Sequence, residues 1–188
     1  MDGGLCAACL AVGGAGMLHK LTAFAQIDGR KLMDLYQEGN RENAPYFFPE
    51  IKEQALALKK VEQRFLEYVE TDFFGRNGSE YWILEEDGVW ISALRLYKIS
   101  EEFYYMEALE THPDFRKRGY AARLLAGVIE DLKTRGPFRL CDCVGKNNAA
   151  SLGVHRKCGF ETVSDQAVNY LDNSSNQRCY GMEYTFHL

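Results

Sequence analysis

The chain has 188 residues and a formal net charge of −5, with 46% hydrophobic and 26% charged residues. This is the balance of one globular domain with a buried core. The aromatic fraction of 13% argues against a disordered chain, and the acidic balance argues against a protein that binds nucleic acid. We expect no membrane span either, because the apolar run at residues 5–17 is too short to cross a bilayer as a helix.

The N-terminal stretch differs from the rest of the chain. Its apolar run has only Asp2 as a charged residue ahead of it, whereas a secretory signal requires a basic region there. We therefore interpret residues 1–16 as an N-terminal extension of doubtful status. Residues 17–188 are then expected to form a single domain.

Six cysteines offer two competing interpretations. Cys6 with Cys9 and Cys141 with Cys143 could together supply four zinc thiolates. The first pair lies in the doubtful extension, however, and the second lies in a strand-like run. We therefore expect no metal site, and we expect reduced thiols in a cytoplasmic protein.

Hydrophobic periodicity and turn chemistry predict the elements in chain order. Asp28 suits the cap of a helix that begins at Gly29, and Asp87-Gly88 suits the tight turn of a hairpin. Strands are expected at Leu18–Gln26, Tyr81–Glu85, Val89–Tyr97, Phe103–Glu110, Phe138–Val144, Phe160–Asp165 and Cys179–His187. Further helices are expected at Glu50–Phe73, Gly119–Thr134 and Asn148–Cys158, with a loop at Asn40–Pro49. The order β-α-α-β-β-β-α-β-α-β-β predicts an α/β fold of the α+β mixed-sheet kind, a central twisted sheet with helices on both faces.

The first chemical signal is the segment Arg116-Lys-Arg-Gly-Tyr-Ala121 between a strand and a helix. Gly119 allows a tight turn and a close approach of the backbone to a ligand. A helix start presents unpaired N–H groups to an anion, and Arg116, Lys117 and Arg118 add positive charge. The segment therefore predicts a phosphate-binding turn, although a plain basic helix cap fits the same residues. It matches neither the Walker pattern nor the three-glycine spacing of a dinucleotide-binding fold.

The context of this turn resembles the GNAT superfamily of acetyl-CoA-dependent N-acetyltransferases. The resemblance rests on the turn, on the preceding Leu109-Glu110-Thr111-His112-Pro113, and on the later Asn148-Ala-Ala-Ser151 and His155-Arg-Lys-Cys-Gly159-Phe160. It implies that the turn holds the CoA pyrophosphate and that the strand at Phe103–Glu110 pairs with the pantetheine arm, while the strand at Phe138–Val144 splays away. The cofactor contacts that it implies come from Leu109, Thr111, Arg116, Lys117, Arg118, Gly119, Tyr120, Ala121, Asn148 and Ser151.

Acetyl transfer to an amine needs a base for the ammonium proton. In similar proteins this base often comes from the strand before the turn, so Glu107 is the first candidate and Glu110 the second. The period-2 rule places them on opposite faces, with Glu107 on the face of Tyr105 and Leu109. Either carboxylate also fits a solvated position on a strand.

The acid that protonates the CoA sulfur is a Tyr in much of the family, but His155 occupies that position here. Histidine can donate a proton near neutral pH, so we include His155 among the catalytic candidates. It fits equally a packing residue, with water protonating the thiolate. Asp142 stands in a strand core, where it must be exposed or hydrogen-bonded.

The acceptor is expected to contact Arg41, Tyr46 and Phe47, which lie in the aromatic loop after the first helix. The same aromatics could instead fill the core between helices. The expected activity is direct acetyl transfer from acetyl-CoA to an amine in a ternary complex, by a monomer or homodimer. The alternatives are a catalytically inactive CoA-binding sensor or regulatory module, and an interaction protein whose basic turn contacts another phosphate.

Overall fold

The computed structural model describes residues 10–11 and 16–187. Its main sheet has eight strands in the order β1-β2-β3-β4-β5-β6-β10-β7. Only β5 and β6 run parallel, and every other neighbouring pair is antiparallel. The strands are β1 (Leu10–Ala11), β2 (Met17–Leu21), β3 (Glu80–Glu86), β4 (Val89–Ser100), β5 (Phe103–Thr111), β6 (Phe138–Gly145), β7 (Glu161–Ser164) and β10 (Cys179–Phe186), while β8 (Ala167–Val168) and β9 (Ser175–Asn176) form a small second sheet.

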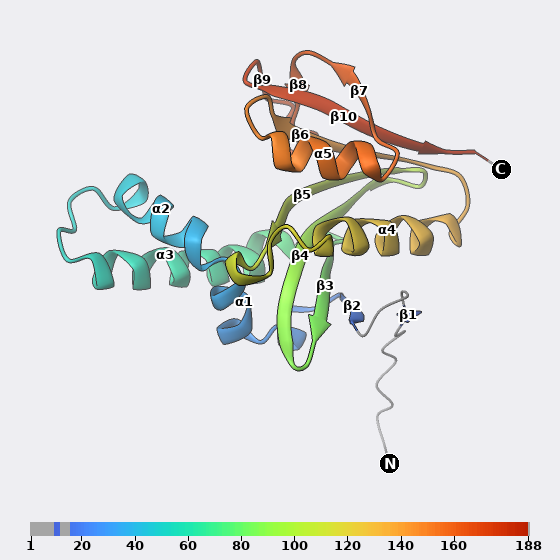
Figure 1. The fold of residues 1–188 in the computed structure, drawn as a ribbon. Coiled ribbons are helices and arrows are strands. Elements are labelled where there is room, and N and C mark those ends of the chain that lie inside the picture. The colour runs from blue at the N-terminus through green and yellow to red at the C-terminus, as the bar shows by residue number, and fades with distance from the viewer. Residues whose placement is uncertain (1–9, 12–15, 188) are drawn as a thin grey trace.

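Helices cover both faces of the main sheet, so the predicted α/β mixed-sheet architecture is confirmed (Figure 1). One core lies between the sheet and α4 with α5, and it includes Leu124, Leu125 and Val128 of α4. The other core lies against α1 and the end of α3 and includes Leu32 and Phe73. The helices are α1 (Gly29–Leu35), α2 (Gln37–Phe47), α3 (Gln54–Tyr68), α4 (Tyr120–Lys133) and α5 (Ala149–Lys157), with short turns at η1 (Phe24–Gln26), η2 (Val69–Phe73) and η3 (Pro113–Phe115).

Local sequence signals place several boundaries well. The Asp28 carboxylate accepts hydrogen bonds from the N–H groups of Arg30 and Lys31, as expected of the cap of α1. Asp87 and Gly88 both have positive φ, at 51° and 78°, which is the geometry of a hairpin turn of the primed type.

Three predicted boundaries are wrong. The expected loop at Asn40–Pro49 is largely the helix α2, which continues through Pro45. The first strand ends at Leu21 and is followed by η1 rather than reaching Gln26. The third helix begins at Gln54 rather than Glu50 and ends in the π-helical turn η2. Burial of Ala44 of α2 against Ala57 and Val61 of α3 stabilises α2 despite its weak helix formers, because tertiary packing outweighs local propensity.

Most of the N-terminal extension, and both Cys6 and Cys9, lie outside the described residues. The two residues of β1 are described, and they pair with Met17 and Leu18 of β2. Among the described residues we find no helix long and apolar enough to cross a membrane and no group of three potential metal ligands.

Candidate active site

The start of α4 is open to a ligand. Gly119 precedes the helix with φ of 85°, and no side chain caps the N–H groups behind it. A Cβ at Gly119 would meet no heavy atom within 4 Å, so packing within the described structure does not explain the glycine. The positive φ favours glycine, and the open space leaves the positive end of a 14-residue helix available to an anion.

Charged side chains around this turn divide into two groups. Arg116 pairs with Glu38 of α2 and, at 3.1 Å, with Glu110 of β5. Arg116 thus ties the turn to two other elements. Lys117 and Arg118 are exposed and remain free to approach a phosphate. The Tyr120 side chain points towards β3, because its hydroxyl donates a hydrogen bond to Glu86 at the end of that strand.

The strands β5 and β6 diverge beside the turn. They pair only at Phe103–Tyr105 with Arg139–Cys141, although β5 continues to Thr111 and β6 to Gly145. The remaining part of β5, with Leu109 and Thr111, therefore presents a strand edge that β6 does not cover. Such an edge can pair with an extended ligand, which agrees with the expected splay of Phe138–Val144.

A bulge in β5 changes the direction of its side chains. Ala108 has φ of 56°, and the pairing with β4 shifts between Arg95, opposite Glu107, and Ala93, opposite Glu110. The extra residue breaks the alternation. Ala108 packs against the core under α1, and Leu109 packs against the core under α4. The prediction that Glu107 and Glu110 lie on opposite faces of the strand is therefore wrong, because both carboxylates lie on the face covered by α2 and α3.

Glu107 is held by three neighbours. Its Oε1 accepts hydrogen bonds from Tyr97 at 2.6 Å and Tyr68 at 3.3 Å, and it lies 3.1 Å from the Arg95 guanidinium. Burial, followed by the charge of Glu107, raises the pKa of Tyr97, so that hydroxyl stays protonated and donates. The carboxylate is thus part of a charged and hydrogen-bonded network with Arg95, Tyr97 and Tyr68.

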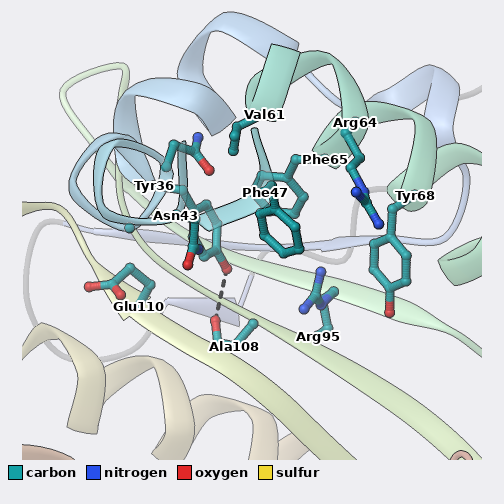
Figure 2. A pocket seen from close by; sticks show the side chains of 12 residues that line it. Tyr36, Asn43, Phe47, Val61, Arg64, Phe65, Tyr68, Arg95, Ala108 and Glu110 are labelled. Atoms are coloured by element: carbon teal, nitrogen blue, oxygen red, sulfur yellow. Dashed lines mark hydrogen bonds between the residues drawn. The ribbon is translucent and has the colours of Figure 1, made fainter. Parts of the chain in front are cut away.

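Glu110 lies on the wall of a cavity of about 490 Å³ between α2, α3, β4 and β5 (Figure 2). The Tyr36 hydroxyl donates a 2.8 Å hydrogen bond to the carbonyl of Ala108 across this cavity. That bond fixes the bulge to the end of α1. The complete lining is Tyr36, Gly39, Asn40, Asn43, Phe47, Val61, Arg64, Phe65, Tyr68, Arg95, Ala108 and Glu110.

The three residues expected to contact the acceptor lie in different places. Phe47 lines the cavity beside Glu110. Arg41 lines a second hollow of about 330 Å³ on the other side of α2 and α3. Tyr46 is 79% exposed and lines neither. The helical form of α2, which the loop prediction missed, separates them, because successive side chains of a helix point in different directions.

His155 is fully buried, with 0% exposure. Its Nε2 lies 2.8 Å from Asp142 Oδ2, and its Nδ1 lies 2.8 Å from the carbonyl oxygen of Ser151. A carbonyl only accepts, so Nδ1 carries a proton, and a second proton on Nε2 suits the carboxylate. Burial lowers the pKa of His155, but the hydrogen bond and charge of Asp142 and the bond to Ser151 outweigh it and raise the pKa. Both nitrogens are therefore occupied inside the fold.

Asn148 and Ser151 lie at the start of α5. The Asn148 side chain accepts a hydrogen bond of 3.0 Å from the N–H of Ser151 and so caps this helix. Asn148 is exposed and Ser151 is half-buried, as is Ala121 on α4. The helix start at Asn148 follows the end of β6, next to the diverging strands.

Sequence reasoning missed the cavity residues Tyr36, Arg64, Tyr68 and Arg95. One signal was present: Arg95 is a charged residue inside the otherwise apolar run of β4. Such a residue must have a partner when it is buried. Tyr36 and Tyr68 carried no signal, because their helical spacing is that of ordinary core residues.

A mixed sheet with one diverging parallel pair, next to an uncapped basic helix start, suits an extended ligand that ends in a phosphate. Comparison with known proteins identifies the class. The model of the Acetyltransferase (GNAT) family matches residues 31–160. A [ribosomal protein bS18]-alanine N-acetyltransferase of Salmonella typhimurium is 31% identical over 113 residues, covering 57% of this chain and 75% of that protein.

Solved structures show the same fold. The PaiA N-acetyltransferase of Thermoplasma acidophilum, in complex with coenzyme A, has a TM-score of 0.61 at 14% identity, covering 90% of this chain and 99% of that one. An acetyltransferase of Streptococcus agalactiae has a TM-score of 0.63 at 14% identity, covering 92% and 99%. The chain belongs to the GNAT acetyltransferase family, and it is an N-acetyltransferase that uses acetyl-CoA.

Proposed function

We propose that residues 17–188 transfer the acetyl group of acetyl-CoA directly to a primary amine bound in the cavity between α2, α3, β4 and β5. One observation carries the proposal. The same stretch of β5, from Ala108 to Thr111, borders both the uncovered edge beside β6 and the cavity. A thioester along that edge and an amine in the cavity would therefore meet at the bulge, as a ternary complex requires.

We assign the predicted cofactor residues to different parts of acetyl-CoA according to their position. The N–H groups behind Gly119, with exposed Lys117 and Arg118, suit the pyrophosphate. The edge of β5 at Leu109 and Thr111 suits the amide groups of the pantetheine arm. We assign the polarisation of the thioester carbonyl to the N–H groups next to the bulge. Asn148, Ser151 and Ala121 lie at the starts of α5 and α4 beside the same wedge, whereas the Tyr120 hydroxyl is turned towards Glu86.

Glu110 is our proposed base. It lines the cavity, whereas the carboxylate of Glu107 is held by Arg95, Tyr68 and Tyr97. In the reaction Glu110 accepts the proton of the bound ammonium, the amine nitrogen attacks the thioester carbon, and the C–S bond breaks. The CoA thiolate leaves, and the second proton of the attacking amine passes to it through water, so that the products are the amide and the free thiol and Glu110 returns its own proton to solvent. Water carries this proton because both nitrogens of His155 are engaged within the fold. Arg116, paired with Glu110, positions that carboxylate.

Thiol release from acetyl-CoA, followed against a panel of primary amines, tests this assignment. We expect amine-dependent release in the wild type. Glu110→Gln should reduce kcat/KM by roughly 10²-fold near pH 7, within the usual contribution of a general base. The loss should shrink at high pH, because the amine then loses its proton without help.

Two outcomes would contradict the proposal. Equal rates for Glu110→Gln and the wild type at every pH would remove Glu110 as the base. Binding of acetyl-CoA without thiol release for any amine would indicate a regulatory CoA-binding module instead of direct transfer.

A further inference from the structure

The cavity has an uneven distribution of charge. Glu110 lies at one side, next to the bulge, and Arg64 and Arg95 lie at the other (Figure 2). Glu110 is already paired with Arg116. The lining thus carries two guanidinium groups against one carboxylate, although the chain as a whole has a net charge of −5. Arg95 has Glu107 as its counter-ion just behind the cavity wall, so the positive charge that remains without a partner among the described residues is that of Arg64.

Arg95 is only partly neutralised. Its side chain is 13% exposed and contacts Glu107 through Nη2 alone, and its Nε is buried without a hydrogen-bond partner. A buried donor without a partner costs free energy that a bound acceptor group can recover. The rings of Tyr68 and Phe65 lie 4.9 and 5.7 Å from the guanidinium carbon and hold the group at the cavity wall.

Arg64 reaches the same side of the cavity from α3. Its guanidinium lies over the ring of Phe47, 4.7 Å from the ring centre, and within the described part of the chain no ion pair engages it. Two guanidinium groups that converge in this way, one on a helix and one on a strand, suit a planar carboxylate, because arginine donates in pairs.

Resting on the proposed function, we propose that the acceptor is an amine that also carries a carboxylate, bound with its amino group towards Glu110 and its carboxylate between Arg64 and Arg95. The apolar side chains of Val61, Phe47 and Phe65 would cover the part of the acceptor that joins the two groups. A diamine or polyamine would place its second cation against the arginines, and like charges brought together reduce affinity.

The experiment uses acceptors matched in length. ω-Amino carboxylates of increasing chain length are compared with the corresponding ω-amino carboxamides and α,ω-diamines, with thiol release from acetyl-CoA as the readout. At the best length we expect kcat/KM to be at least tenfold higher for the carboxylate than for the carboxamide, and lower still for the diamine. Peptides with a free N-terminus and Glu or Gln at the third position distinguish a peptide source of the carboxylate from a free small molecule.

Arg64→Gln should reduce the preference for carboxylate over carboxamide to about twofold or less, because it removes one of the two guanidinium groups. Lys60→Gln is the matched control: it removes one positive charge from the exposed surface of the same helix, outside the cavity, and should leave the preference unchanged. A wild type that uses carboxamides or diamines as well as carboxylates would overturn the inference, as would an Arg64→Gln variant that keeps the full preference. Absence of thiol release with every amine would count against the proposed function itself, which separates the two failures.

Discussion

Ala108 lies at the bulge in β5, between the two carboxylates Glu107 and Glu110. Its φ of 56° is unusual for a residue other than glycine and costs of the order of 1–2 kcal/mol. The hydrogen bond from Tyr36 to its carbonyl compensates part of this cost. Local strain of this kind is often found at functional sites. Here the bulge brings Glu107 and Glu110 onto one face, so that one carboxylate can stabilise Arg95 while the other lines the cavity.

The two carboxylates are therefore expected to have separable roles. Glu107→Gln removes the counter-ion of Arg95, a largely buried charge. We predict a loss of about 2 kcal/mol in the free energy of unfolding, or roughly 4–8 °C in Tm for a chain of this size. Thermal unfolding followed by circular dichroism measures it.

Glu110→Gln is the control for this variant, because Glu110 is more exposed and its partner Arg116 keeps a second carboxylate in Glu38. Its Tm should stay within about 2 °C of the wild type, since exposed ion pairs contribute little. A Glu107→Gln protein as stable as Glu110→Gln would show that Arg95 does not depend on Glu107.

Among the secondary-structure elements, β6 and α5 are joined by the buried pair of Asp142 and His155 (2.8 Å). The rings of His155 and Phe160 also pack in a T-shaped arrangement, with 5.0 Å between ring centres. His155 also fixes the first turn of α5, because its Nδ1 donates a hydrogen bond to the carbonyl of Ser151. The residue that takes the place of the family's tyrosine thus stabilises the wall of the wedge between β5 and β6.

The pKa of His155 is raised from 6.5. This direction determines how the contribution of the Asp142–His155 pair to the free energy of unfolding changes with pH. The pair contributes its full stability below about pH 6.5, and this contribution is lost as pH rises through the raised pKa. Asp142→Asn removes the charge of the partner. We predict that it lowers the free energy of unfolding by about 3 kcal/mol at pH 6 and by clearly less at pH 9, measured by urea unfolding.

Asp165→Asn provides the comparison, because Asp165 forms an exposed ion pair with Lys146. This substitution should change the free energy of unfolding by under about 1 kcal/mol at both pH values. If the effect of Asp142→Asn is the same at pH 6 and pH 9, His155 is not charged in the folded protein.

Elements with strong local signals could be predicted from the sequence. The cap at Asp28, the turn at Asp87-Gly88 and the buried stripe of α4 depend on residues near one another in the chain. The helix α2 could not be predicted, because it contains Gly39 and Pro45 and depends on packing against α3. The bulge at Ala108 could not be predicted either, since alanine gives no sign of a positive φ and the conformation is set by neighbouring strands.

At the scale of the whole molecule, the two halves of the proposed site lie on opposite faces of the sheet, on either side of β5. The turn before α4 belongs to the face covered by α4 and α5, and α2 and α3 belong to the other (Figure 1). The cavity is lined by residues of α2 and α3. β5 connects the two halves. Most of the predicted cofactor contacts come from one continuous segment, residues 109–121, with Asn148 and Ser151 added from α5, and they stay a prediction. The lining of the cavity gave no such signal, because it comes from separate elements that only the fold brings together.

The central claim is that acetyl-CoA binds at the turn before α4. The most direct test measures Tm with and without the cofactor in the wild type, in Gly119→Val and in Gly136→Val. Gly136 is a matched control, because it also has positive φ and open space around it but follows the far end of α4. Both substitutions should lower Tm in the absence of ligand.

At a concentration of about 100 Kd, a ligand that binds only the folded state adds about 2.7 kcal/mol, or roughly 5–10 °C. We predict this rise for the wild type and for Gly136→Val, and its loss in Gly119→Val. An equal rise in Gly119→Val, or no rise in the wild type at millimolar acetyl-CoA, would contradict the assignment of this turn as the cofactor site.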